Sequence, residues 1–211
     1  MKATWSVTAV VAAGLVVGCG AAPADLDENR TQDTRQAVGA PAALLFSEYV
    51  EGSAHNKAVE IVNPLAQDVA LEGYQLRLWS NGAAQPTATL LLDGVITAGR
   101  TLVICHPHAG VALLGRCDVT DAAVTAFNGN DALELVYVGA QVRVVDTFGD
   151  LRPASPFWGT GVTRTMDATL LRHCAVAQGH STFAGRFDPS LEWDAAAEDD
   201  FSNVGAWHCL K

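Results

Sequence analysis

The feature of this sequence that most constrains its fold is a series of short segments in which apolar and polar residues alternate. In residues 74–79, Tyr, Leu and Leu alternate with Gln, Arg and Trp, and the turn dipeptide Asn81-Gly82 follows. Alternation with a period of two is typical of half-buried strands, and turn signals about ten residues apart favour an antiparallel β-sandwich. No segment of this region has convincing helical periodicity. Comparable strand segments lie at 87–92, 101–105, 133–137 and 142–146.

Two further predicted strands, 44–50 and 57–63, flank a polar loop, and each carries a carboxylate inside an otherwise apolar pattern. Strict alternation places Glu48 on a face whose other residues, at positions 44, 46 and 50, are apolar. Glu60 interrupts the second strand in the same way. Because burial of an unpaired carboxylate is strongly unfavourable, we expect Lys57 or backbone N–H groups of the loop to face Glu48.

Length and charge limit the possible classes of function. The 211 residues are enough for one good core, and 49% of them are apolar. The formal charge is −10; the first 18 residues carry one basic residue and no acid, so the rest has 12 basic against 23 acidic residues, or −11. This is the wrong sign for a protein that binds the nucleic-acid backbone.

The amino terminus resembles an export signal. Lys2 precedes an uncharged apolar run that is short for a membrane span, which predicts a signal peptide over residues 1–18. Val16-Val17-Gly18-Cys19 resembles a bacterial lipobox, in which Cys19 becomes the acylated first residue and binds the protein to a membrane. An ordinary signal peptide cleaved nearby is the alternative. Residues 19–42 then form a flexible tether.

The five cysteines fit an exported protein. If Cys19 carries lipid, four remain, and three pairings of these four are possible. We favour Cys105–Cys117, which closes a short loop, and Cys174–Cys209, which ties the carboxyl terminus to the body of the domain.

Several motifs together resemble lamin-tail domains in their bacterial, secreted form. The similarity begins with Ser47-Glu48-Tyr49 and continues in order through the chain to about position 205. One departure is Asn130, where many relatives have Asp. The other matching groups are Glu51-Gly52-Ser53, Asn56-Lys57, Glu60-Ile61-Val62-Asn63, Gly73-Tyr74 within 71–78, Phe127 to Leu133, Asp146 with Gly149, Trp158-Gly159, Thr169-Leu170, Phe187-Asp188-Pro189 and Glu192-Trp193.

The resemblance implies an immunoglobulin-like antiparallel β-sandwich. Residues 43–150 would form the sandwich core, and residues 151–211 a disulfide-tied extension that packs on the same domain. Related domains are often appended to secreted nucleases and phosphatases, but this chain has no room for a second catalytic domain. Neither a Gly-x-Ser-x-Gly motif nor a His-Glu-x-x-His motif is present.

Two groups of polar residues are candidates for a site, and we interpret both as structural braces of loops. They could also hold Ca²⁺ through Glu48, Glu60, Asn128 and Asp131, or Glu48 and Glu60 could act as acid and base. The bracing interpretation is favoured because Asx residues beside glycine form turns and buried carboxylates accept hydrogen bonds. The bracing residues are Glu48, Asn56, Lys57, Glu60, Asn63, Asn128 and Asp131.

Four weaker signals remain in the sequence. Cys105-His106-Pro107-His108 with Cys117 could form a zinc site, but an oxidising compartment favours a disulfide. Two tryptophans, Trp79 and Trp158, are candidate contact anchors, although packing within the fold is the commoner outcome. The remaining signals are an acidic run at Asp194, Glu198, Asp199 and Asp200, and scattered histidines with no recognisable partner at positions 55, 173, 180 and 208.

The sequence therefore predicts a non-catalytic, lipid-anchored module of the bacterial cell envelope, or a protein of the cell surface or medium, that serves adhesion, assembly or partner recognition. The expected partners are a membrane, through the lipid, and a protein or cell surface, with no cofactor and no nucleic acid. The alternatives are a Ca²⁺-stabilised accessory module of a secreted hydrolase system and, third, a nuclease that depends on Glu48.

Overall fold

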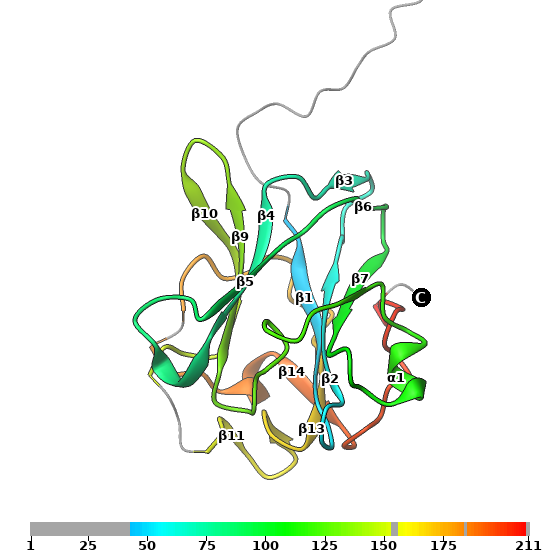
Figure 1. The fold of residues 1–211 in the computed structure, drawn as a ribbon, viewed down its shortest axis with the longest axis vertical. Helices are drawn as coiled ribbons and strands as arrows, with labels where there is room; N and C mark the ends of the chain where they lie inside the picture. Colours follow the sequence, from blue (N-terminus) through cyan, green and yellow to red (C-terminus); the bar gives the residue numbers. More distant parts are fainter. Residues whose placement is uncertain (1–42, 153–155, 184, 210–211) are drawn as a thin grey trace, which may run out of the picture. The chain divides into compact units, whose positions relative to one another are not determined.

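A computed structural model describes residues 43–152, 156–183 and 185–209. They all belong to one compact unit, Gly39–Lys211. The unit is built almost entirely from strands that form two main sheets (Figure 1). Within the described ranges, no helix has the length and apolar character that a membrane crossing requires.

The larger sheet has six strands, and β1 and β2 lie at its centre. The segment after position 150 supplies two of its strands, β13 and β14, so the carboxyl-terminal part of the chain is built into the sheet. In spatial order the strands are β14 (Trp193–Ala196), β13 (Ala168–Arg172), β1 (Leu45–Glu51), β2 (Lys57–Val62), β7 (Thr101–Cys105) and β8 (Val119–Thr120).

The second sheet has four strands, and the remaining elements are short. Its order is β10 (Val142–Phe148), β9 (Ala132–Val138), β4 (Tyr74–Trp79) and β5 (Ala88–Leu91). Two further pairs are β3 (Val69–Ala70) with β6 (Val95–Ile96), and β11 (Gly159–Thr160) with β12 (Thr163–Arg164); the helical turns are η1 (Ser80–Gly82), α1 (Val111–Leu114) and η2 (Pro189–Leu191).

The main core lies between the two large sheets. It combines buried residues of the six-stranded sheet, such as Phe46, Tyr49 and Ile61, with residues of the four-stranded sheet, such as Leu76 and Leu135. The Tyr49 ring stacks on Phe148 of the opposite sheet at a centroid distance of 4.2 Å. The predicted all-β sandwich is therefore confirmed.

Two details differ from the prediction. β7 and β8 pair in parallel, whereas every other strand pair recorded in the described ranges is antiparallel. The chain between β7 and β8 contains α1, which returns it to the same edge of the sheet. At four residues, α1 is too short to show a helical period in the sequence.

A β-bulge at Ser47 changes which face of β1 is apolar. Phe46 pairs with Ile61 and Glu48 pairs with Glu60, so β1 holds one more residue than its partner at this point. As a result Phe46 and Tyr49 both enter the main core, while Glu48 faces the other side of the sheet. The prediction that Phe46 and Glu48 share a face was wrong, because strict alternation fails across a bulge.

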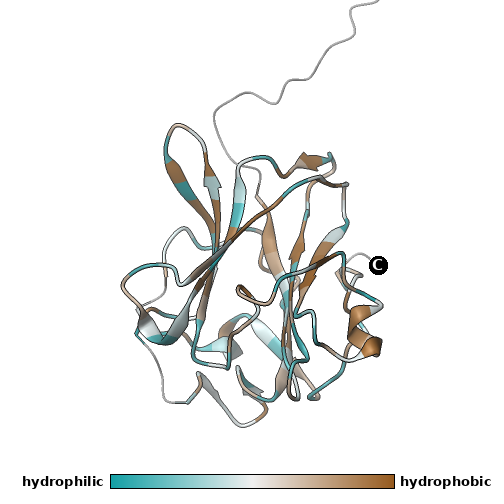
Figure 2. Cartoon of the chain, viewed as in Figure 1, coloured by the Kyte–Doolittle hydropathy of each residue, from teal (hydrophilic) through white to brown (hydrophobic). Residues whose placement is uncertain are grey.

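The outer face of the six-stranded sheet has its own apolar cover. Val50, Ala58 and Val103 of the sheet pack against Leu113 of α1 and Val204 of the carboxyl-terminal segment. Figure 2 shows the apolar character of α1 and of strands β1, β2 and β7 beside it. Glu48 and Glu60 are both buried, with exposed fractions of 2% each.

Both favoured disulfides are present and hold this cover in place. Cys105–Cys117 links β7 to the chain after α1, and Cys174–Cys209 links the chain after β13 to the carboxyl-terminal segment. The other candidate pairings of these four cysteines are thereby excluded in the folded chain.

Replacement of both Cys174 and Cys209 by Ser should lower the free energy of unfolding by about 2–4 kcal/mol, because the disulfide closes a long loop in the unfolded chain. The two cysteines are separated by 35 residues and are not part of the apolar core, so little packing is lost. Urea unfolding of the oxidised wild type and the double variant measures the difference. Equal stability would show that the carboxyl-terminal cover is held without this link.

Candidate functional site

The two central glutamates lie opposite each other on neighbouring strands. Glu60 accepts a hydrogen bond from Ser47 Oγ at 2.6 Å through one carboxylate oxygen. Its other oxygen accepts from the backbone N–H of Gly205, in the carboxyl-terminal segment, at 2.7 Å. Glu60 therefore joins the bulge of β1 to the apolar cover of the sheet.

Glu48 lies in a less favourable environment for a charge. Burial raises the pKa of Glu48 from its ordinary value of 4.5 to about 9, and the nearby Glu60 and Asp200 add to the shift, while Arg116 opposes it. Its Oε1 atom has no hydrogen-bond partner among the described residues. Glu48 is thus neutral at physiological pH, which removes the repulsion that two adjacent carboxylates would otherwise have.

Lys57 contacts Glu51 instead of Glu48, which corrects the expected pairing. The Lys57 ammonium forms an ion pair with Glu51 Oε1, and Glu51 Oε2 accepts from the backbone N–H of Asp167 at 2.6 Å. Glu51 of β1 lies directly opposite Lys57 of β2 in the sheet, so the two side chains are neighbours on the same face. The ion pair closes the end of the β1–β2 hairpin.

Asn56 braces the loop between β1 and β2 by contacts with two other segments. Its Oδ1 accepts from the N–H of Gly110 at 2.8 Å, and its Nδ2 donates to Asp199 at 2.9 Å. Asp199 also accepts from the hydroxyl and the backbone N–H of Ser53. Asp199, which belongs to the acidic run near the carboxyl terminus, therefore holds this loop through hydrogen bonds, so the run is not only a solvated surface.

Asn63 and Asp131 fix two turns. Asn63 Nδ2 donates to the carbonyls of Gln67 and Ile96 at 2.8 and 2.9 Å. The Asp131 carboxylate accepts from the backbone N–H of Asn81 at 2.6 Å and of Asn128 at 3.0 Å. Asn128 takes part through its main chain, while its side chain is exposed. Burial raises the pKa of Asp131, and these two N–H groups oppose the rise.

The cysteines of the candidate zinc site are bound to each other, so they are not available as metal ligands. The three histidines nearby nevertheless come together. His55 stacks on His106 at a centroid distance of 4.5 Å, and His108 lies 5.6 Å from His55. His106 Nδ1 accepts from the N–H of His108 at 3.1 Å. His55 was wrongly described as isolated, because its partners lie about 50 positions away in the sequence.

A buried ionic network that the sequence did not predict joins the two sheets. Asp146 of β10 accepts from the N–H of Phe46 at 2.9 Å and from Arg172 Nη1 at 3.2 Å. Arg172 also pairs with Glu192 at 2.8 Å, and Glu192 contacts His180 at 2.9 Å. Burial raises the pKa of Asp146, although Arg172 and three backbone N–H groups act in the opposite direction. His180 and Glu192 therefore have partners in this network, and their spacing in the sequence did not indicate these contacts.

The tryptophans proposed as contact anchors are packed within the fold. Trp79 is half-buried, and its ring meets Phe183 edge to face at 5.9 Å. Trp158 is buried, and its ring lies against Gly149, where an added Cβ atom would approach the ring to 3.0 Å. Gly149 also has a φ of +88°, a conformation that favours glycine.

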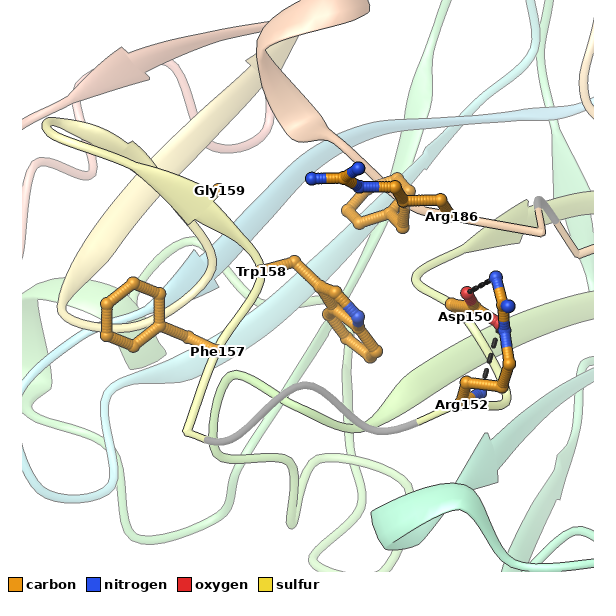
Figure 3. Close-up of a pocket in the computed structure, with 7 residues that line it drawn as sticks. Asp150, Arg152, Phe157, Trp158, Gly159 and Arg186 are labelled. Atoms are coloured by element: carbon orange, nitrogen blue, oxygen red, sulfur yellow. Dashed lines mark hydrogen bonds and ion pairs between the residues drawn. The ribbon is translucent and has the colours of Figure 1, made fainter.

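A pocket of about 420 Å³ lies beside Trp158 (Figure 3). Figure 3 shows the Trp158 ring between the Phe157 ring and the Asp150–Arg152 pair. Asp150 accepts from the backbone N–H and the guanidinium of Arg152, at 3.0 and 3.1 Å. The sequence did not identify this site, since its residues come from separate segments. The pocket is lined by Asp150, Arg152, Phe157, Trp158, Gly159, Arg186 and Phe187.

No protein-family model matches the chain, and a search of curated proteins finds no significant match. The predicted lipidation residue Cys19 lies outside the described residues.

Replacement of Glu48 and of Glu51 by Gln should change the free energy of unfolding in opposite directions. Between pH 4.5 and about pH 9, Glu48 is ionised in the unfolded chain and neutral in the folded one, so its contribution to stability is lost as the pH rises through this range. Glu48→Gln should therefore be more stable than the wild type by about 2–4 kcal/mol at about pH 8, with the difference vanishing toward about pH 4.

Glu51→Gln is the matched control, because it removes a carboxylate that has an ion pair and an N–H donor. It should be less stable than the wild type at the higher pH. Urea unfolding of the three proteins at both pH values gives the comparison. A Glu48→Gln variant that is destabilised at high pH would contradict the neutral state of Glu48.

Proposed function

We propose that this chain is a lipid-anchored, non-catalytic β-sandwich of the bacterial cell envelope that serves adhesion, assembly or partner recognition. The observation that carries this proposal is the use of the candidate carboxylates. Glu51, Glu60 and Asp131 each have both carboxylate oxygens engaged by donors of the protein itself. All three are also buried, so they stabilise the fold and do not reach a substrate.

The arrangement of Glu48 and Glu60 also supports a structural role. A catalytic acid and base must reach the substrate, whereas these two side chains lie beneath the apolar cover of the sheet. The raised pKa of Glu48 follows from burial, as it would in a structural site.

The fold class agrees with the resemblance to lamin-tail domains at the level of an all-β sandwich. We extend this to an immunoglobulin-like lamin-tail domain as part of the proposal. The two disulfides fit an oxidising compartment outside the cytoplasm. Together with the lipobox, they support an exported protein that a membrane holds through Cys19.

Metabolic labelling of the expressed chain with palmitate tests the anchor. Cys19→Ala should abolish the label, because the acyl chains require the cysteine at the cleavage site. Gly20→Ala is the matched control, since it changes the adjacent residue and retains the cysteine, and it should keep the label. If Cys19→Ala were still labelled, the proposed lipid anchor at Cys19 would be contradicted.

The Ca²⁺-stabilised alternative predicts a different result. The Asp131 carboxylate is buried and already accepts two backbone N–H groups, so we expect no change in melting temperature between excess Ca²⁺ and a chelator. Thermal unfolding monitored by circular dichroism measures this. A rise of several degrees with Ca²⁺ would favour the alternative.

A further inference from the structure

Three arginines lie at or near the pocket beside Trp158, although the chain as a whole is acidic. The chain has 13 basic residues and a net charge of −10. Arg152 and Arg186 line the pocket, and the Arg164 guanidinium lies 5.7 Å from the centroid of the Phe157 ring in its wall. Two of these arginines are neutralised by aspartates, so the pocket keeps the charge of Arg186 for an anion.

Among the described residues, Arg186 is the pocket arginine that has no partner and can bind a ligand. Arg152 is paired with Asp150, and Arg164 with Asp167. Arg186 forms no hydrogen bond or ion pair with another residue in the described part of the chain. Its guanidinium has two parallel donors that match the two oxygens of a carboxylate.

The aromatic part of the pocket is held in place by the fold. The backbone N–H of Trp158 donates to Thr165 Oγ1 at 3.0 Å, and the Trp158 and Phe187 rings meet edge to face at 5.7 Å. Trp158 is 6% exposed, so it offers the pocket a narrow apolar surface. Phe157 and Phe187 are half-buried and widen that surface.

Asp150 supplies acceptors next to these rings. Its carboxylate is mostly buried and is oriented by two donors of Arg152. An ionised carboxylate has about four lone-pair sites, so two remain for hydroxyl groups of a ligand. The volume of about 420 Å³ falls within the range of small-molecule sites.

We infer that this pocket binds a carboxylate-bearing sugar ring, such as a hexuronic acid, and this inference rests on the proposed recognition function. The ligand's carboxylate meets Arg186, its hydroxyls meet Asp150, and its C–H face packs on Phe157 and Phe187. A purely aromatic acid would leave Asp150 unused, and a neutral sugar would leave Arg186 unused.

The test is a titration of the full chain in detergent, followed in ¹H–¹⁵N NMR spectra through the Trp158 indole signal. Four probes separate the contributions: glucuronate, glucose without the carboxylate, cyclohexanecarboxylate without the hydroxyls, and inorganic sulfate. Glucuronate should bind with a Kd about tenfold or more below that of each other probe. Equal affinity for sulfate or cyclohexanecarboxylate would overturn the inference, as would the absence of glucuronate binding.

Variants assign the binding to this pocket. Arg186→Gln, at an exposed position, should weaken glucuronate binding about tenfold and leave the weaker glucose binding unchanged. Arg143→Gln removes the same charge from the β9–β10 hairpin, does not change the pocket lining, and should bind as the wild type does. Equal loss in both variants would indicate a general charge effect and overturn the inference.

The two proposals fail separately. Palmitate labelling depends on Cys19, and sugar binding depends on Arg186. Loss of the label in Cys19→Ala without any glucuronate binding would overturn the pocket alone. Glucuronate binding with an unchanged label in Cys19→Ala would overturn the anchor alone.

Discussion

The structure depends on the burial of two facing glutamates between a sheet and its cover. The bulge at Ser47 turns Glu48 away from the main core and toward Glu60. Two adjacent buried carboxylates cannot both be charged at low cost, so one takes a proton and the other takes hydrogen bonds. Glu60 receives one of these bonds from Gly205, and Arg116 donates to the carbonyl of Val204 beside it. The carboxyl-terminal segment is therefore needed to cover this face of the sheet.

Three other acidic residues, Glu51, Asp146 and Asp199, also accept hydrogen bonds from segments that are distant in the sequence. Glu51 reaches Asp167, Asp146 reaches Phe46 and Arg172, and Asp199 reaches the β1–β2 loop. Hydrogen bonds to charged groups contribute more than neutral ones when both partners are oriented and partly buried. Part of the acidic composition thus has a structural use inside the domain. Under the proposed recognition function, Arg186 is the charge that remains for a ligand, since it has no partner within the described residues.

Much of the fold was predictable because strand alternation and turn residues are local signals. The limits of β7 agree with the prediction, and those of β4, β9 and β10 agree within about two residues. The bulge was not predictable, since residues 44–50 are apolar at odd and even positions alike and the shift in alternation that an extra residue causes cannot be recognised there. The ion pair of Lys57 with Glu51 was missed for the same reason, because the bulge sets the register that places the two residues opposite each other. The histidine cluster, the Asp146 network and the pocket all require contacts between distant segments, which a single sequence does not reveal.

The most direct test of the structural role of the carboxylates is the titration of Glu48 itself, followed by the ¹³C chemical shift of its side-chain carboxyl carbon. We expect the shift of this carbon to show a protonated carboxyl group through neutral pH and a titration at about pH 9. A titration near 4.5, the ordinary value for Glu, would show an ionised and accessible carboxylate. That result would contradict the structural account and return Glu48 to the candidates for binding or catalysis.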